Sequence, residues 1–167
     1  MMLIWILTAV ALLFGFVVAF GAPYVPSLKK EVRNAFTKLY PVSQKDVVAD
    51  LGSGDGSVLR EAARHGAKVY GIELNPLLVL ISNLRLRGHG RVRLGNMWAA
   101  ALPDDVTLVY VFSVTRDGPR LLRTLEREAT RLKRPLNVMT FGEGLRGRKP
   151  VRTLNGHSLY EINPMQS

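Results

Sequence analysis

Cysteine is absent from the chain, which excludes disulfide bonds, a thiol nucleophile and a zinc–thiolate site. Acidic residues are few, with 13 Asp and Glu against 23 Lys and Arg, so the formal net charge is +10 at pH 7. This excess predicts an anionic partner. The basic cluster at residues 146–149 has no interleaved aromatic residue for base stacking, which favours an anionic lipid surface over nucleic acid. The three histidines lack the spacing of metal ligands, so no metal is predicted.

Charge is also missing from the first 22 residues, and residues 3–20 are almost wholly apolar. About 20 residues at ~1.5 Å each span roughly 30 Å, the hydrocarbon thickness of a bilayer. The first charges follow at Lys29 and Lys30, and the positive-inside rule keeps this flank in the cytoplasm. The sequence therefore predicts a single-pass transmembrane anchor over residues 1–22. A cleaved signal peptide stays open as the alternative, since residues 19–21 resemble a cleavage site, although no basic residue precedes the apolar run.

The sequence DLGSGDG at residues 50–56 predicts a ligand-binding turn between an apolar strand and a helix-like run. Glycine permits positive φ and close approach of a ligand, and the first amides of the helix then face a polar or anionic group. Dinucleotide sites use G-x-G-x-x-G, but Ser57 occupies the sixth position here. Asp50 would repel a pyrophosphate and attract the ammonium of a methionine moiety. The turn therefore favours S-adenosylmethionine, with a dinucleotide or a purely structural turn as the alternatives.

A second acid follows the next predicted strand. Glu73 stands at the distance past the glycines at which a carboxylate accepts both ribose hydroxyls of a bound nucleoside. Asn75 and Pro76 then begin a helix, because proline is favoured in a first helical turn. Nicotinamide sites share such an acid, so Glu73 indicates a methionine-bearing nucleoside only together with the turn at residues 50–56.

Strands and helices alternate along the rest of the chain, which predicts a parallel sheet with helices on both faces. The predicted strands are residues 47–51, 68–73, 92–94, 106–112 and 136–141, and the predicted helices are residues 57–65, 77–87 and 118–134. Two further strand-like runs, residues 151–154 and 158–162, are joined by Asn155 and Gly156 as in a hairpin. The predicted fold class is therefore α/β: a Rossmann-like, doubly wound, mostly parallel sheet with a C-terminal antiparallel hairpin, preceded by the transmembrane helix.

Residues 23–46 link the predicted anchor to a predicted catalytic domain at residues 47–167. Ser27 is suited to cap a helix over residues 28–39. Four apolar residues share one face of that helix at spacings of three and four, namely Val32, Ala35, Phe36 and Leu39.

Residues 47–162 resemble the class I, seven-strand methyltransferases that depend on S-adenosylmethionine. The resemblance rests on the DLGSGDG turn, on the acid after the second strand, and on Asn96, Met97 and Trp98 after the third. It implies S-adenosylmethionine as the cofactor and a set of contact residues, which are Asp50, Gly52, Ser53, Gly54, Asp55, Gly56, Glu73, Leu74, Asn96, Met97 and Ser27. Within that set, it assigns the ribose to Glu73 and the adenine to Asn96 and Met97.

A closer resemblance is to the small membrane-anchored protein-lysine methyltransferases that modify the adenine nucleotide translocator and the ATP synthase c-subunit. It rests on the apolar N-terminal segment, on Pro-Tyr-Val-Pro-Ser at residues 23–27, and on Glu-Leu-Asn-Pro at residues 73–76. It implies methyl transfer to a lysine of a protein in or near the membrane. It also implies that the linker and its helix cover the cofactor, with Tyr24, Pro26 and Ser27 near the methyl group or the target lysine.

No motif identifies the catalytic base. The candidates are Tyr24, Asp117 and Glu143, although Asp117 also suits a helix start and Glu143 a solvated loop. Residues 112–115 lack the Asn/Asp-Pro-Pro-Tyr/Phe pattern of amide and adenine N-methylation, which counts against a nucleobase substrate. Two alternatives stay open: a methyltransferase for a small molecule, lipid or RNA, and a non-catalytic S-adenosylmethionine-binding scaffold at the membrane.

Overall fold

The computed structural model describes residues 1–8, 29–114 and 116–165. Most of the predicted transmembrane segment, together with Tyr24 and Ser27, lies outside these ranges. Within them, no helix combines the length and the hydropathy that crossing a membrane requires. The anchor therefore stays a prediction.

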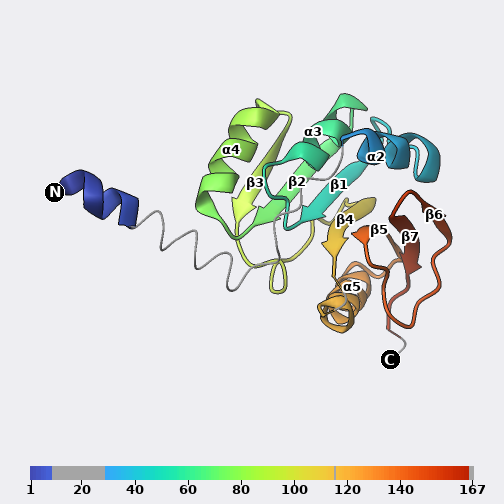
Figure 1. Ribbon diagram of the computed structural model, residues 1–167. Helices are drawn as coiled ribbons and strands as arrows, with labels where there is room; N and C mark the ends of the chain where they lie inside the picture. The colour runs from blue at the N-terminus through green and yellow to red at the C-terminus, as the bar shows by residue number, and fades with distance from the viewer. Residues whose placement is uncertain (9–28, 115, 166–167) are drawn as a thin grey trace.

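A single seven-stranded sheet forms the centre of the domain, in the order β3-β2-β1-β4-β5-β7-β6 (Figure 1). Its strands are β1 Val47–Leu51, β2 Lys68–Glu73, β3 Gly90–Leu94, β4 Leu108–Ser113, β5 Leu136–Gly142, β6 Arg152–Leu154 and β7 His157–Ile162. The first five pair in parallel, and β7 runs antiparallel to both β5 and β6. The predicted sheet is thus confirmed, with small differences at the strand ends.

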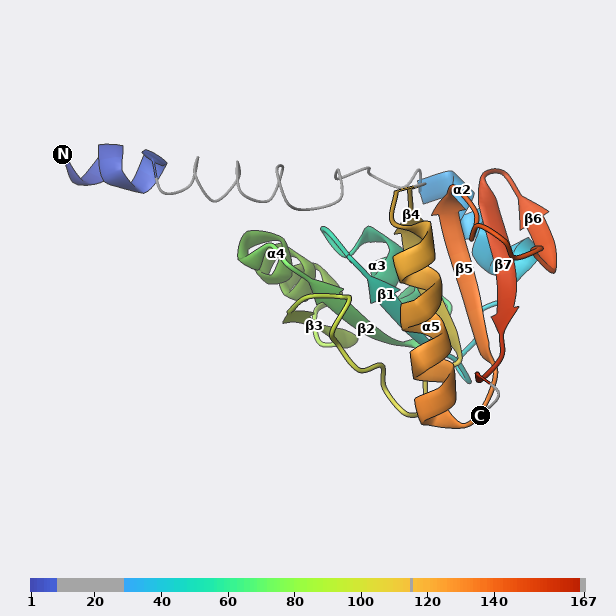
Figure 2. The ribbon, with the colours of Figure 1, turned by 90° about the horizontal axis from the view of Figure 1, so that it is seen from below.

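Helices cover both faces of the sheet, as the sequence predicts (Figure 2). They are α2 Lys29–Asn34, which continues as the π-helix η1 Ala35–Leu39, and α3 Ser57–Arg64, α4 Pro76–Leu86 and α5 Gly118–Leu132. On one face, α2, η1, α3 and α4 surround one buried cluster, whereas α5 contributes to a second cluster on the other face. The predicted helix over residues 28–39 has the right position, but its second half is π-helical rather than α-helical.

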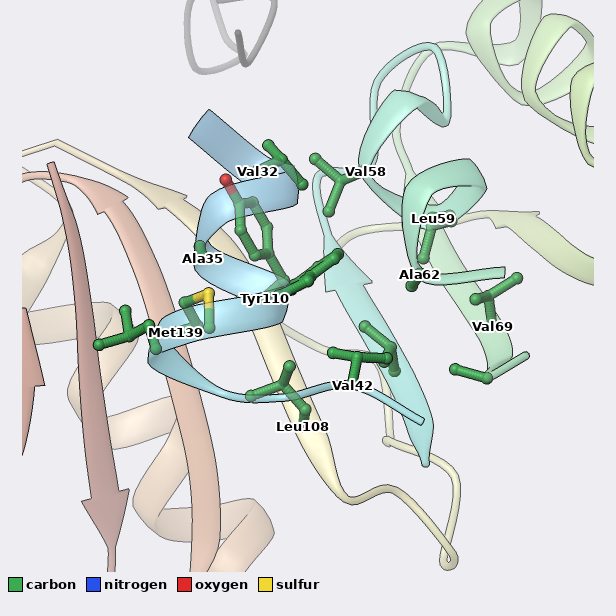
Figure 3. Close-up of a cluster of buried hydrophobic side chains, with 14 of the residues drawn as sticks. Val32, Ala35, Val42, Val58, Leu59, Ala62, Val69, Leu108, Tyr110 and Met139 are labelled. Atoms are coloured by element: carbon green, nitrogen blue, oxygen red, sulfur yellow. The ribbon is translucent and has the colours of Figure 1, made fainter. Parts of the chain in front are cut away.

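The α2–η1 segment is part of the main core (Figure 3). The four residues predicted to share its apolar face are all buried, with exposed fractions of 0–2%. Among them, the Phe36 ring meets the Tyr110 ring edge to face at a centroid distance of 6.0 Å and the His65 ring at 6.5 Å. Residues that precede the predicted domain start at residue 47 therefore share a core with the strands.

The C-terminal hairpin closes the sheet and reaches back to the start of the domain. Asn155 and Gly156 both have positive φ, 47° and 77°, as a two-residue type I′ turn requires, so the predicted hairpin is confirmed. From β6, the Arg152 guanidinium donates hydrogen bonds to the backbone oxygens of Lys38 and Leu39, at 3.0 Å and 3.3 Å. The last strand pair is thereby fastened to the end of η1.

Candidate cofactor site

The glycine turn lies at the carboxyl end of β1, where the strand order reverses. β2 pairs with one edge of β1, and β4 pairs with the other edge. The chain therefore continues from β1 to β2 and β3 on one side, and then crosses to β4 and β5 on the other side. In open α/β sheets such a switch point is where ligands bind. The sequence therefore places its most distinctive motif at the expected position for a ligand.

The turn has the positive-φ backbone geometry that its glycines predict. Gly52, Gly54 and Gly56 have φ values of 80°, 54° and 75°, a region that side-chain-bearing residues rarely adopt. A Cβ on Gly56 would also lie 3.0 Å from the Oγ of Ser82 in α4. The same Ser82 hydroxyl donates a 2.7 Å hydrogen bond to the Gly54 carbonyl, so α4 holds the turn in place.

Glu73 is fixed beside the turn by two backbone amides. Its Oε2 accepts a hydrogen bond from the Gly54 N–H and its Oε1 accepts one from the Asn75 N–H, both at 2.8 Å. The residue is 8% exposed, and each carboxylate oxygen has a second lone pair. The side chain is therefore oriented and can accept two further hydrogen bonds, the number that a ribose diol offers.

Asp50 is the most perturbed acid of the site. Burial raises the pKa of its carboxyl well above the ordinary value, and the nearby charges of Glu73 and Asp55 raise it further. A cationic group placed beside Asp50 would favour the ionised carboxylate. This arrangement fits a ligand that carries an ammonium and two hydroxyls, and it does not fit a pyrophosphate.

Replacing Asp50 with asparagine is expected to stabilise the ligand-free protein at neutral pH. The native pKa of this carboxyl lies above its unfolded value of about 3.9, so the folded state binds more protons in the window between the two values. Wild-type stability therefore falls as pH rises through that window, and the asparagine variant escapes this loss. Thermal unfolding across the pH range should show a melting-temperature gap that widens with pH.

The exposed Glu143 provides the matched control for that prediction. Glu143→Gln removes a carboxyl from an exposed position, and its melting temperature should stay close to that of the wild type. A gap for Asp50→Asn that is independent of pH, or that has the opposite sign, would contradict the buried-acid interpretation.

Asp55 serves the structure of the turn. Its Oδ1 accepts hydrogen bonds from the Ser57 N–H at 3.1 Å and the Ser57 hydroxyl at 2.7 Å, and its Oδ2 pairs with Arg85 of α4. Burial alone would raise the pKa of Asp55, but the hydrogen bonds from Ser57 and Arg85 hold it below the ordinary value. All of these contacts join the turn to α3 and α4.

The remaining predicted contact residues border the same turn. Gly95 donates its N–H to the Glu73 carbonyl at 2.9 Å, which brings the segment after β3 beside the end of β2. Met97 is half-buried, with its Sδ 3.6 Å from the position of a Cβ on Gly52, and Leu74 is 42% exposed. Asn96 is exposed, and its Oδ1 accepts a hydrogen bond from the Trp98 N–H at 3.0 Å. Apolar surface therefore flanks Glu73.

Ser53 has a buried hydroxyl with no hydrogen-bond partner among the described residues. Its N–H donates to the Ile72 carbonyl at 3.0 Å, so the backbone of the turn is satisfied while the side chain is not. The position of a Cβ on Gly71 lies 2.7 Å both from this hydroxyl and from the Leu59 side chain, so the hydroxyl faces the core between α3 and the sheet. Of Ser53, the backbone is therefore the part that can contribute to a ligand site.

Asp117 and Glu143, the two candidates for the catalytic base that the structure describes, have few side-chain contacts. Asp117 is the residue before α5; it makes no capping hydrogen bond with its side chain, and its Oδ1 lies 3.4 Å from the Arg116 Nε. Glu143 is exposed, and its N–H donates to the Ser113 carbonyl at 3.0 Å, next to the end of β4. Tyr24, the third candidate, lies outside the described residues.

Sequence reasoning missed a buried polar group beneath α2. The Tyr110 hydroxyl lies 3.0 Å from the His157 Nε2, and the His157 ring packs 4.6 Å from the Phe141 ring. Burial lowers the pKa of His157, and the charge of Glu31 partly opposes this shift. The Glu31 Oε2 is buried and has no hydrogen-bond partner among the described residues. No motif pointed to Glu31, because a single acid in an amphipathic helix resembles a solvated one.

Metal ligands do not gather anywhere in the described ranges: no three His, Cys, Asp or Glu side chains lie together in a way that would hold an ion.

Comparison with known proteins decides the family. A model of the methyltransferase domain matches residues 49–135. The chain belongs to the methyltransferase domain family. A protein-lysine N-methyltransferase of Saccharolobus islandicus (strain REY15A) is 32% identical to this methyltransferase over 139 residues, which cover 79% of this chain and 83% of the relative. The family predicted from the sequence is thus confirmed.

Two further matches differ in how much of the other protein they cover. The ATP synthase c-subunit lysine N-methyltransferase of Xenopus laevis is 33% identical over 111 residues, which are 64% of this chain and 48% of that protein, so the chain spans about half the length of this relative. The crystal structure of an RNA methyltransferase from Salinibacter ruber, in complex with S-adenosyl-L-homocysteine, superposes with a TM-score of 0.72 at 27% identity. That match covers 86% of this methyltransferase and 96% of the other chain.

Proposed function

We propose that this chain is an S-adenosylmethionine-dependent protein-lysine N-methyltransferase. One observation carries the proposal: Glu73 is held by the Gly54 and Asn75 amides with acceptor capacity to spare, beside the buried carboxyl of Asp50. When bound, S-adenosylmethionine supplies an electrophilic methyl group on a sulfonium sulfur. Methyl transfer is an in-line displacement, so the main task of the protein is to orient the two reactants.

Different residues of the site would contact different parts of the cofactor. Asp50 would face the ammonium of the methionine moiety, and Glu73 would accept hydrogen bonds from the ribose hydroxyls. Leu74 and Met97 offer apolar surface for the adenine ring, with Asn96 at its edge. A pyrophosphate at this position would meet several acids, so a dinucleotide is disfavoured.

Lysine as the acceptor is supported by the names of the two curated relatives, which are both lysine N-methyltransferases. A lysine has a pKa of about 10.4 and must lose its proton before it can attack. An apolar, aromatic environment lowers that pKa. Phe112 and Phe141, with ring centroids 6.1 Å apart near the ends of β4 and β5, provide such surface. The Glu31 Oε2, which is buried and has no hydrogen-bond partner among the described residues, is suited to orient the incoming ammonium.

We propose that residues 1–22 anchor the chain in a membrane as a single pass and that the catalytic domain faces the cytoplasm. The support is the uncharged, apolar sequence of that segment and the basic residues that follow it. Such an anchor would keep the site close to substrates in or near the bilayer. Tyr24 and Ser27, just beyond the anchor, stay proposed contacts of the cofactor or the target lysine.

RNA is the second candidate acceptor. The protein that superposes with a TM-score of 0.72 is named an RNA methyltransferase, and the net charge of +10 would favour a polyanion. Against RNA, residues 112–115 lack the Asn/Asp-Pro-Pro-Tyr/Phe pattern. Lysine is therefore the preferred acceptor.

Labelling of membranes tests the proposal. Membranes that contain the full chain are supplied with methyl-labelled S-adenosylmethionine and then treated with protease, nuclease or organic solvent. We expect protease alone to release the label, and acid hydrolysis of the labelled protein to yield methylated lysine. The Glu73→Gln variant, which should bind the cofactor poorly, provides the background. Release of the label by nuclease would identify RNA as the methyl acceptor, and release by solvent would identify a lipid. No label above background would favour a non-catalytic scaffold.

A further inference from the structure

Helix α4 has an exposed apolar face in addition to its buried one. Ser82 and Leu86 are buried against the rest of the domain. On the outward side, Leu77, Leu80 and Leu84 are 45%, 57% and 68% exposed. Their spacings of three and four place them on one face of the helix. A helix that is apolar on both sides is normally covered on both sides.

The edge strand β3 extends this face. Leu94 is 59% exposed and lies two residues after the buried Val92, so both side chains point to the side of the sheet that carries α4. We call Leu77, Leu80, Leu84 and Leu94 the leucine face. Helix α4 packs on β3, and exposed apolar side chains gathered on two such neighbouring elements mark a contact with a protein or a membrane. In Figure 1, α4 and β3 form one end of the sheet, far from the hairpin β6–β7.

A basic cavity of about 390 Å³ opens between α3 and α4, at the C-terminal end of α4. Its polar lining consists of Arg60, Arg64, Arg85, Arg87 and His89, and no acid lines it. Arg64 and Arg85 are paired with Glu61 and Asp55, whereas Arg60 and Arg87 form no ion pair with any described residue. The cavity is therefore suited to an anionic group with several acceptor oxygens, such as a phosphate.

The leucine face and the basic cavity meet at the C-terminal end of α4. Arg87, which lines the cavity, follows Leu84 by three residues, a spacing that puts both on one side of the helix. We infer that together they form a docking surface for an anionic lipid bilayer. The leucines would enter the boundary between headgroups and acyl chains, and the arginines would bind lipid phosphates. An amphipathic helix with cations beside its apolar face binds membranes in this way.

Two other partners fit this surface less well. A second copy would apply the same patch to itself, which would bring Arg60 and Arg87 of both chains together without acids to neutralise them. RNA would satisfy the arginines, but it would leave the leucine face in water, because base stacking uses aromatic side chains.

The docking surface goes beyond methyl transfer and holds for any methyl acceptor. With the proposed anchor, it would give the domain two separate membrane contacts. One contact would limit the distance of the domain from the bilayer, and the second would fix which side of the domain faces it.

The absence of cysteine makes this inference directly testable. Single-cysteine variants Leu80→Cys and Leu84→Cys of the full chain are labelled with an environment-sensitive fluorophore and reconstituted into vesicles of phosphatidylcholine, with or without phosphatidylglycerol. The matched control is Arg123→Cys, on the exposed side of α5 across the sheet. We expect blue-shifted emission and quenching by doxyl-labelled lipid at positions 80 and 84 in the anionic vesicles, and neither effect at position 123.

A second arm tests the cavity. Adding Arg60→Gln and Arg87→Gln to the labelled protein should shift the docking equilibrium toward the undocked state by about fivefold per arginine, and high salt should act in the same direction. Emission that stays unshifted at position 84 would overturn the inference. So would emission that is blue-shifted but not quenched by doxyl lipid, because a protein segment or a second copy would then cover the face. Equal quenching at all three positions would overturn it as well. Loss of methylation with normal quenching would count against the proposed function alone.

Discussion

Replacing Glu73 with glutamine is expected to weaken the binding of S-adenosylhomocysteine by about 100-fold, the equivalent of one or two charge-assisted hydrogen bonds. The carboxylate now accepts hydrogen bonds from the Gly54 and Asn75 amides and keeps lone pairs for a ribose. A glutamine carries one N–H₂ group in place of an oxygen, so that group would face either a backbone donor or a ribose hydroxyl with the wrong polarity. The variant therefore disturbs the turn and the ligand contact together.

Isothermal calorimetry on the full chain in detergent micelles measures this effect. Glu143→Gln provides the control, because Glu143 is exposed and makes no side-chain hydrogen bond with a described residue. Its dissociation constant should match the wild type. A thermal melt of each variant separates a lost contact from a lost fold. Unchanged affinity in a folded Glu73→Gln protein would refute the assignment of the ribose hydroxyls to Glu73.

Replacing Phe36 with alanine is expected to lower the free energy of unfolding by about 3–5 kcal/mol. Phe36 is fully buried, and its ring contacts those of Tyr110 and His65. Its loss would leave a cavity between η1, α3 and the sheet, which the surrounding helices can fill only partly. Because domains of this size are stable by about 5–15 kcal/mol, a large share of the total would be lost.

Urea unfolding followed by circular dichroism checks this prediction, with Leu80→Ala as the control. Leu80 is 57% exposed on α4, and its truncation should change stability by less than about 0.5 kcal/mol. If Phe36→Ala lowered the free energy of unfolding as little as Leu80→Ala, the segment before β1 would be a loosely attached linker. A selective loss for Phe36→Ala would show that α2–η1 is a structural part of the domain.

Much of the fold could be predicted from the sequence because its signals are local. Continuous apolar runs mark strands that are buried on both faces, and β4 and β5 are such strands. The Asn-Gly pair at residues 155–156 fixes a hairpin turn, and positive φ at the glycines of residues 52–56 follows from the motif itself. The face of α2–η1 was predictable from helical spacing, although the π-helical second half was not.

The partners of the polar groups could not be predicted, because they lie far apart in the chain. Asp55 pairs with Arg85, which is 30 residues away, and the sequence gives no reason to prefer that arginine over its neighbours. Glu128 lies among arginines in a helix whose sequence is typical of a solvated face, yet it is 3% exposed, and its Oε2 accepts a hydrogen bond from the Leu102 N–H at 2.9 Å. Such contacts depend on how the helices pack against the sheet, which periodicity does not specify.

The fastening of Arg152 to the end of η1 has a consequence for biosynthesis. The helix that enters the domain first and the strand pair that completes the sheet are mutual partners, although more than a hundred residues of chain separate them. Such distant pairings form late. Translation must therefore deliver β6 before this contact can form, and until then the opening helix depends on its packing in the core. An N-terminal membrane anchor would be inserted while the domain that it carries is still incomplete.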